Sequence, residues 1–359
     1  MKYLFFIQGE GRGHMTQALT LKEKLESRGH EILAAVVGID KNKELPSFFR
    51  QQINIPLFTV DSPGFAVDKK GKGIKIFKSV RRTIWRLPLY FHSLKKIKKI
   101  VTDLNPDILI SFYEPTAGNY CRLYREKRRL FCLGHQYFIG HPSFKFPKIG
   151  RLKRWSFKLY NRLSAPRRAV KIALSFTAED DRPLKKLFVC PPLIRRAVKE
   201  EPPRTEDFFL LYLLNVGYSE EIVAWSQANP SIKIEAFWNR PGEEETRFGQ
   251  NLIFHRLNNE KFIKRLAACR AYVATAGFES IAEAAYLKKN ILMIPTKNHF
   301  EQKCNAGDAK RAGLAITAEI FNLSLITDRQ TKTHSAGALD AFKEWVDNYD
   351  DKIVGLLEK

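Results

Sequence analysis

The sequence has few of the features that mark secreted, metal-binding or membrane-spanning proteins. Its five cysteines, at positions 121, 132, 190, 269 and 304, are scattered without a CxxC pair. This spacing disfavours zinc sites and disulfides and indicates reduced thiols in a cytosol-like compartment. No apolar run approaches the ~18 residues of a membrane-spanning helix. The run that begins at Met1 is too short for a signal peptide, so we expect a first strand there and a cytoplasmic protein.

Acidic residues are missing from two long stretches of the N-terminal half. Residues 69–102 contain twelve Lys and Arg and residues 127–178 contain thirteen, with no Asp or Glu in either stretch. Residues 1–200 carry a net charge of +25 (41 basic, 16 acidic), whereas residues 201–359 carry −2 (20 basic, 22 acidic). This uneven distribution of positive charge predicts an anionic partner for the N-terminal half.

The length of 359 residues is enough for two α/β domains, each with its own core. An apolar content of 44% with mixed charge is typical of a globular protein. Proline pairs at 191–192 and 202–203 mark a linker. We therefore expect a basic first domain over residues 1–196, a second domain over 205–335 and a helical tail over 338–359 that packs back towards the first domain.

The clearest ligand-binding pattern lies in the C-terminal half. A short β-type run, 271–274, breaks at residues 275–277 and is followed by a helical pattern over 278–286 and a second apolar run over 291–295. Such a strand–turn–helix–strand unit is typical of a parallel sheet. Gly277 allows the backbone to approach a ligand, and the N–H groups of the first helical turn can bind an anion.

The order of residues through this unit resembles the donor-binding signature of UDP-sugar glycosyltransferases of the GT-B fold. The positions that carry the resemblance are Gly277, Ser280, Glu283, Pro295, Glu301, Gln302, Asn305 and Ala306. The pattern is most similar to the branch containing the enzyme that adds N-acetylglucosamine to a lipid-linked peptidoglycan precursor. The resemblance implies two Rossmann-like, doubly wound parallel-sheet domains that face each other across a cleft.

The resemblance also implies roles for single residues. The helix N-terminus would hold the diphosphate, Glu283 the ribose diol, and Glu301 with Gln302 the hydroxyl groups of the donor sugar. The base of the nucleotide would lie near the loop with Arg256 and Leu257, which follows the strand at 251–254. The implied donor-binding residues are Gly277, Phe278, Glu279, Ser280, Glu283, Glu301, Gln302, Arg256 and Leu257. The alternative is an ordinary βαβ unit with solvated glutamates.

A glycine-rich turn, Gly9-Glu10-Gly11-Arg12-Gly13-His14, separates the first strand from the first helix. Its glycine spacing is not the dinucleotide fingerprint, so NAD binding is not expected. The turn resembles the glycine-rich loop of the GT-B acceptor domain. The resemblance implies acceptor contacts from Gly11, Arg12 and Gly13, and makes His14 the candidate base for the acceptor hydroxyl. The open alternative is that His14 only caps the helix or binds substrate.

A carboxylate usually holds the tautomer of a base histidine. In related plant enzymes an Asp at the end of a later strand does so, but the comparable strand here, 107–112, has Ser111 at that place. Glu114 is therefore a second catalytic candidate, which would orient His14 or act as the base itself. The alternative is an exposed loop glutamate.

The acid-free stretches carry apolar residues at helical spacing. A helix is predicted over 77–101, which Pro88 kinks or divides. Basic amphipathic segments with aromatic residues are typical of peripheral membrane surfaces, so residues 69–102 and 144–171 are expected to hold a lipid-linked or anionic acceptor. The alternative is a core-facing helix with a solvated basic back. His135, after the strand at 131–133, is a candidate acceptor contact by the same resemblance, against a simple loop residue.

We therefore expect a glycosyltransferase of the hexosyltransferase type that uses a UDP-sugar and needs neither a metal nor a cofactor. It would act at an anionic membrane surface, on the cytoplasmic inner face. The chain has no DxD motif, and helix N–H groups can neutralise a leaving diphosphate.

The sequence leaves two rival functions open. A UDP-N-acetylglucosamine 2-epimerase would need further cleft carboxylates, for which Glu10 and Glu114 are the obvious candidates. A noncatalytic binder of an anionic polymer such as nucleic acid is disfavoured, because it leaves Glu283, Glu301 and Gln302 without a role.

Overall fold

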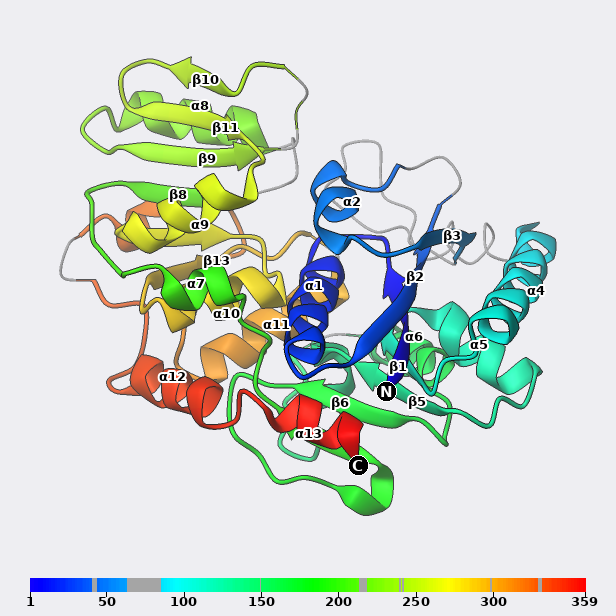
Figure 1. The fold of residues 1–359 in the computed structure, drawn as a ribbon. Helices are drawn as coiled ribbons and strands as arrows, with labels where there is room; N and C mark the ends of the chain where they lie inside the picture. Colours follow the sequence, from blue (N-terminus) through cyan, green and yellow to red (C-terminus); the bar gives the residue numbers. More distant parts are fainter. Residues whose placement is uncertain are drawn as a thin grey trace. The chain divides into compact units, whose positions relative to one another are not determined.

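The computed structural model describes residues 1–40, 44–62, 85–148, 150–212, 218–238, 240, 242–297, 299–328 and 331–359. These residues form two compact α/β units (Figure 1). The first contains the described chain up to Leu193 together with Tyr349–Lys359, and the second contains Ile194–Asn348. Each unit is built on a seven-stranded sheet covered by helices, which confirms the predicted fold class of doubly wound α/β units.

The sheet of the first unit is parallel throughout, with the strand order β3-β2-β1-β4-β5-β6-β7. Its strands are β1 (Lys2–Gln8), β2 (Glu31–Ile39), β3 (Leu57–Asp61), β4 (Ile108–Phe112), β5 (Arg129–Leu133), β6 (Val170–Leu174) and β7 (Leu187–Cys190). The order reverses between β1 and β4. In open parallel sheets, ligands bind beyond the carboxyl ends of the strands at such a reversal.

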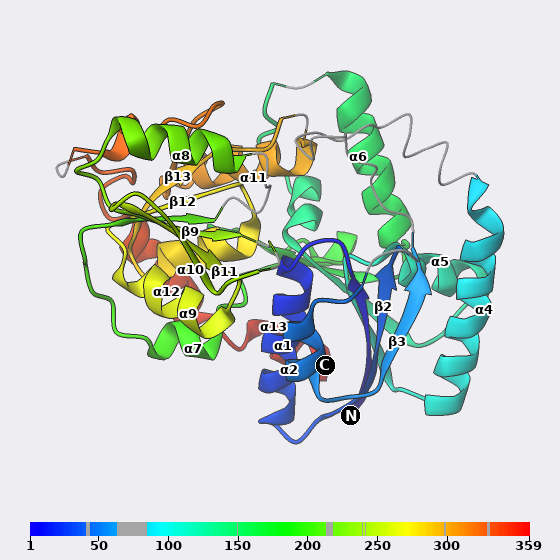
Figure 2. The same cartoon turned by 90° about the horizontal axis from the view of Figure 1, so that it is seen from above.

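Helices cover both faces of this sheet. They are α1 (Gly13–Glu26), α2 (Ser47–Ile53), α4 (Leu87–Leu104), α5 (Pro115–Leu123) and α6 (Arg151–Ser164), with the 3₁₀ helices η1 (His135–Gly140) and η2 (Pro183–Lys185). Figure 2 shows α1 and α2 on one face and α4 and α5 on the other. Pro88 lies in the first turn of α4. The N–H groups of a first turn have no hydrogen-bond partner within the helix, so the N–H that proline lacks is not missed there. The part of the predicted helix in 63–84 lies outside the described residues.

The C-terminal tail contains two helices, α12 (Ala338–Asn348) and α13 (Lys352–Glu358), and not the single helix expected from the sequence. α12 belongs to the second unit, where Tyr286 Oη donates to Asp347 Oδ1 at 2.8 Å. Tyr349–Lys359 belong to the first unit, where Lys352 Nζ lies 2.9 Å from Asp181 Oδ1. None of the helices in the described ranges is long and apolar enough to cross a membrane.

The sheet of the second unit has the order β10-β11-β9-β8-β12-β13-β14, and only its edge strand β10 is antiparallel to its neighbour. Its strands are β8 (Phe209–Tyr212), β9 (Ile234–Trp238), β10 (Glu245–Phe248), β11 (Leu252–Arg256), β12 (Ala271–Ala274), β13 (Asn290–Met293) and β14 (Ile316–Thr317). Its helices are α7 (Arg196–Glu200), α8 (Ser219–Ala228), α9 (Asn259–Ala268), α10 (Phe278–Tyr286), α11 (Phe300–Arg311), η4 (Leu323–Ile326) and α12. β12 and α10 have the boundaries predicted from the sequence.

Candidate functional site

In the second unit, two loops meet at the carboxyl edge of the sheet. β12 and β13 are adjacent and parallel, so the loops that lead from them into α10 and α11 leave the sheet side by side. α11 anchors both loops: Asn305 Nδ2 donates to the Ala276 carbonyl at 2.9 Å, and Gln302 Oε1 accepts from the Thr296 N–H at 2.7 Å. The sequence-predicted residues around Gly277 and Gln302 are therefore brought together by direct contacts.

The N-terminus of α10 has no side-chain cap. Its N-cap residue is Gly277, whereas Asn258 caps α9 and His299 caps α11 through side-chain hydrogen bonds. A Cβ placed on Gly277 would meet Ser280 Oγ at 3.8 Å as its nearest neighbour, so the described residues do not crowd this turn. The N–H groups of the first turn of a helix bind anions in such a setting.

Glu283, in the second turn of α10, is buried and paired with Arg195. Arg195 Nε lies 2.6 Å from Glu283 Oε1, and Nη2 donates to Oε2 at 2.7 Å. Burial alone would lower the pKa of Arg195, but the charge and hydrogen bonds of Glu283 raise it above its ordinary value. This bidentate pair holds the carboxylate in a fixed orientation. Each carboxylate oxygen has the capacity to accept more than one hydrogen bond, so the pair with Arg195 does not use up the acceptor capacity of Glu283.

The other predicted donor residues lie on the same edge of the sheet. Glu301 and Gln302 are half-buried in the first turn of α11. Arg256 ends β11 and is exposed, and its Nη1 donates to the Gly242 carbonyl at 3.4 Å. The Leu257 N–H donates to the Trp238 carbonyl at 3.2 Å, which ties this loop to β9.

In the first unit, His14 stands at the carboxyl end of β1. The preceding turn needs Gly11, whose φ of +95° is in the left-handed region, and the Arg12 guanidinium lies 4.2 Å from the centre of the Phe48 ring. Gly13 begins α1, and the N-cap residue is Arg12 with no side-chain cap. His14 therefore does not cap the helix. The alternative that it only binds substrate stays open beside the role of base.

The imidazole of His14 is buried between two side chains that sequence reasoning did not identify. Its Nδ1 lies 3.2 Å from Gln17 Oε1, one turn further along α1. Its ring stacks on Tyr113 with centroids 5.7 Å apart. When Nδ1 carries the proton and donates to Gln17, Nε2 keeps its lone pair and can accept a proton. The spacing of three residues between His14 and Gln17 was the signal available in the sequence.

Glu114 is fully buried, which excludes the exposed-loop alternative. Its Oε1 accepts from Ser62 Oγ at 2.7 Å and from the Thr116 N–H at 2.9 Å. In the described part of the chain the carboxylate makes no hydrogen bond to His14, so Gln17 contacts the imidazole in its place. Gly38 leaves the room for this carboxylate, because a Cβ there would collide with it. Burial raises the pKa of Glu114 to about 7, which suits a group that exchanges protons near neutrality.

The raised pKa of Glu114 predicts a pH-dependent stability. Because the folded-state pKa of about 7 lies above the ordinary 4.5, the folded state binds the proton more tightly, so stability is full below pH 4.5 and falls as pH rises through 7. The loss is on the order of 3 kcal/mol. Glu114→Gln is expected to remove this slope in urea unfolding between pH 5 and 8.

A matched control for this prediction is Glu126→Gln. Burial opposes the shift, but hydrogen bonds from Arg128 and Tyr120 lower the pKa of Glu126 from its ordinary value, in the direction opposite to the shift of Glu114. The control should keep the slope of the wild-type protein. An unchanged slope in Glu114→Gln would contradict the assignment.

His135 occupies a structural position. It is buried in η1, its Nδ1 lies 2.8 Å from the Leu174 carbonyl, and its ring packs on Phe138 and Phe176. These contacts favour the simple structural alternative over the predicted acceptor contact.

Three comparisons relate the chain to known proteins. Residues 1–328 match the model of the family described as glycosyl transferase family 1. The chain is 29% identical over 340 residues to a glycosyltransferase of Methanosarcina mazei, covering 87% of this chain and 85% of that protein. It is 23% identical over 334 residues to one of Methanosarcina acetivorans, covering 87% and 84%.

Solved structures share the fold of the whole chain. The glycotransferase of kitacinnamycin superposes with a TM-score of 0.63 at 16% identity, covering 99% of this chain and 98% of that one. Acinetobacter baumannii MurG superposes with a TM-score of 0.57 at 13% identity, covering 100% and 99%. These similarities confirm the predicted GT-B fold.

Proposed function

Because the chain belongs to glycosyl transferase family 1, it is a glycosyltransferase, and we propose that its donor is a UDP-sugar. The observation that carries this proposal is the uncapped N-terminus of α10, with the carboxylate of Glu283 in the next turn. Positive helix ends attract diphosphates, and a fixed carboxylate is a good acceptor for the two hydroxyls of a ribose. The donor is therefore held by one helix and the loop beside it.

Each group of the donor has a partner in this arrangement. Residues 277–280 bind the diphosphate, Glu283 the ribose diol, and Glu301 with Gln302 the hydroxyls of the sugar, while the uracil lies near Arg256 and Leu257. The N–H groups and the helix dipole stabilise the negative charge that develops on the leaving diphosphate. The proposed transfer needs no metal ion and no cofactor for this reason.

The acceptor hydroxyl loses its proton to His14. As the acceptor oxygen forms its bond to the anomeric carbon, Nε2 takes the proton, and UDP leaves with the electron pair of the broken bond. Gln17 holds the productive tautomer by accepting from Nδ1. Glu114 is the second candidate for the base, since its pKa is raised to about 7.

We further propose that the acceptor is lipid-linked or otherwise anionic and is met at the cytoplasmic face of a membrane. Support comes from the surface of the first unit, whose net charge is strongly positive. α4 exposes Leu87, Leu89 and Phe91, and α6 exposes Trp155 with Leu159 between basic residues. Exposed apolar side chains among lysines and arginines are typical of proteins that rest on anionic bilayers.

A UDP-release assay with and without a membrane lipid extract tests this function. The proposal predicts UDP release that depends on lipid and a labelled sugar that moves into the lipid fraction. Isomerisation of the sugar would instead support the 2-epimerase alternative. Failure to consume any UDP-sugar, together with nucleic-acid binding, would support the polymer binder.

Asn305→Ala provides a separate test of the donor loop. The substitution leaves the buried Ala276 carbonyl without its partner, at a cost of about 1–3 kcal/mol, and loosens the turn before α10. We expect a lower urea midpoint and a several-fold weaker Kd for UDP by calorimetry. The matched control is Asn322→Ala, which removes the cap of η4 in the same unit and should leave the Kd for UDP unchanged. An equal rise in the Kd for UDP in both variants would contradict the positioning role of Asn305.

A further inference from the structure

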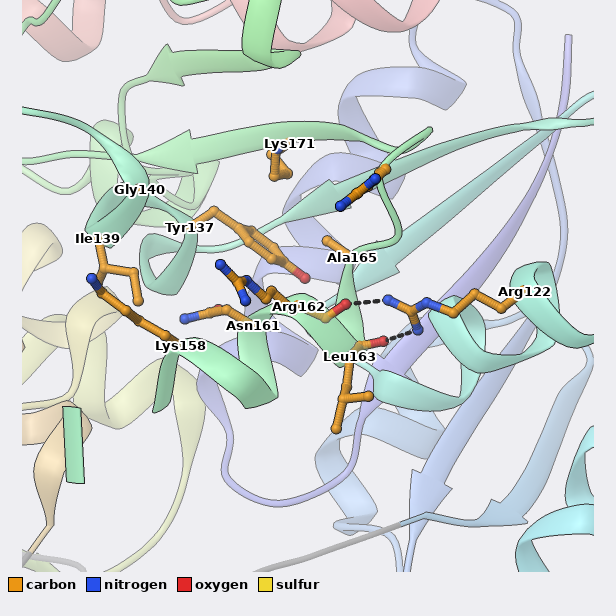
Figure 3. Close-up of a pocket in the computed structure, with 11 residues that line it drawn as sticks. Arg122, Tyr137, Ile139, Gly140, Lys158, Asn161, Arg162, Leu163, Ala165 and Lys171 are labelled. Carbon is orange, nitrogen blue, oxygen red and sulfur yellow. Dashed lines mark hydrogen bonds between the residues drawn. The ribbon is translucent and has the colours of Figure 1, made fainter. Parts of the chain in front are cut away.

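The first unit contains a cavity whose lining includes none of the proposed donor-binding or catalytic residues. It has a volume of about 830 Å³ and lies among α5, α6, η1 and β6 (Figure 3). Five of its eleven lining residues are basic and none is acidic: Arg122, Lys158, Arg162, Arg167 and Lys171. Its size falls in the range of sites for small molecules.

Among the described residues, the side chains of four of these five cations make neither an ion pair nor a hydrogen bond. In the described part of the chain, no ion pair is found for Lys158, Arg162, Arg167 or Lys171. Arg122 differs, because its guanidinium donates to two carbonyl oxygens at the C-terminus of α6 (Figure 3). One belongs to Leu163, at 2.6 Å, and the other to Arg162. Arg122 therefore stabilises the helix end, and the other four leave the cavity with an uncompensated positive charge.

Two further observations indicate that this space suits a polar ligand. The side-chain oxygen and nitrogen of Asn161 are both buried at the cavity, and neither has a hydrogen-bond partner among the described residues. Such orphaned groups are costly unless a ligand or water satisfies them. Burial lowers the pKa of Lys171, and the charges of Lys185 and Lys186 lower it further, so a bound anion would stabilise its protonated form.

The positive surface continues beyond the cavity. A neighbouring hollow of about 810 Å³ shares Arg122 and Arg167 as a common wall. Its one acidic lining residue, Glu126, is already paired with Arg128 at 3.1 Å. The other cations of the second hollow, among them Arg125, Arg168 and Lys186, add to the field that an anion would meet in the first.

We propose that the cavity between α6 and β6 binds a phosphate-bearing molecule. The phosphate oxygens accept from Arg162, Arg167 and Lys171, and Asn161 supplies one donor and one acceptor to the rest of the ligand. The site belongs to the first unit, whereas the proposed donor residues belong to the second. It is close to the catalytic histidine, because Tyr137 of the cavity wall contacts Tyr113 at 5.5 Å, and Tyr113 stacks on His14.

The phosphate group could come from a soluble metabolite or from the headgroup of a lipid. Inorganic pyrophosphate and vesicles of phosphatidic acid in phosphatidylcholine distinguish the two sources. Calorimetry at fixed ionic strength compares the wild-type protein with the double variant Arg162→Gln, Lys171→Gln. The matched control, Lys264→Gln with Lys310→Gln, removes the same charge from exposed positions of the second unit.

We expect the cavity variant to bind pyrophosphate at least about tenfold more weakly and the control to stay within about twofold of wild type. If the vesicles with phosphatidic acid show this loss and pyrophosphate does not, the result would support the site and assign it to a lipid headgroup. Equal losses in both variants, or no binding of either probe by the wild-type protein, would overturn the proposal.

A second measurement uses the wild-type protein, so its result does not depend on whether the variant folds. Lys171 is labelled with an amine-reactive reagent and quantified by mass spectrometry, with the exposed Lys95 as the internal reference. The probe that binds should protect Lys171 several-fold and leave Lys95 unchanged. Equal labelling of Lys171 with and without the probe would contradict the site.

Discussion

His14→Ala is expected to lower kcat by about 10²- to 10⁴-fold and to leave the Kd for UDP within about twofold of wild type. The imidazole is the proposed proton acceptor in the first unit, whereas the proposed contacts to UDP come from the second. Removing the base therefore raises the barrier of the chemical step without removing a donor contact. Steady-state kinetics with a saturating donor and calorimetry with UDP measure the two quantities separately.

Two further variants test whether the fall in kcat comes from the loss of the base. Gln17→Leu removes the partner of Nδ1 while it keeps the imidazole, so we expect a smaller fall in kcat than in His14→Ala. His30→Ala removes another histidine of the first unit, one whose Nε2 lies 2.9 Å from Glu358, and should leave kcat unchanged. An undiminished kcat in His14→Ala would transfer the role of base to Glu114. An equal fall in UDP affinity would refute the division of labour between the units.

Glu283→Ala is expected to weaken UDP binding by about 10- to 100-fold and to destabilise the protein by about 3 kcal/mol. The first effect follows from the loss of two charge-assisted hydrogen bonds to the ribose. The second arises because the substitution leaves the charge of Arg195 buried without its partner. Calorimetry with UDP and urea unfolding measure the two effects.

The double variant Arg195→Met, Glu283→Leu separates the two roles of this carboxylate. Replacing a buried ion pair with apolar residues of similar volume is often neutral, so stability should return to within about 1 kcal/mol of wild type. UDP binding should stay as weak as in Glu283→Ala, because no carboxylate is left for the ribose. Recovery of UDP affinity along with stability would show that Glu283 has only a structural role.

The donor loop could be predicted from the sequence because its signals are local. The short apolar run of β12 ends at a glycine-containing break, and the helical pattern of α10 begins directly after it. The contact between Asn305 and Ala276 lies within the same stretch: the resemblance included Asn305, and the break at 275–277 included Ala276. Periodicity and turn chemistry determine such a unit without reference to the rest of the chain.

The partner of Glu283 could not be predicted in this way. Arg195 lies 88 residues before it, in the segment that leads into α7, and only the tertiary fold brings the two together. Tyr113 was missed for a related reason: its φ of +58° turns the chain after β4, so that its ring meets His14. Non-glycine residues rarely adopt this conformation, and nothing in the sequence marks it.

Burial was the other property that the sequence did not show. Glu114 and His135 were both considered as loop residues, yet both are buried, with different consequences. The pKa of Glu114 is raised, which keeps it as a candidate base, whereas the hydrogen bond of His135 to Leu174 favours a structural role. Which polar side chains a fold buries depends on how distant elements pack, and pattern alone does not determine that.

The most direct test of the proposed donor site is a crystal structure of the protein with UDP. We expect the diphosphate at the N–H groups of residues 277–280 and the ribose hydroxyls within hydrogen-bond distance of Glu283. A nucleotide bound elsewhere, or absent at a UDP concentration that saturates binding in solution, would contradict it.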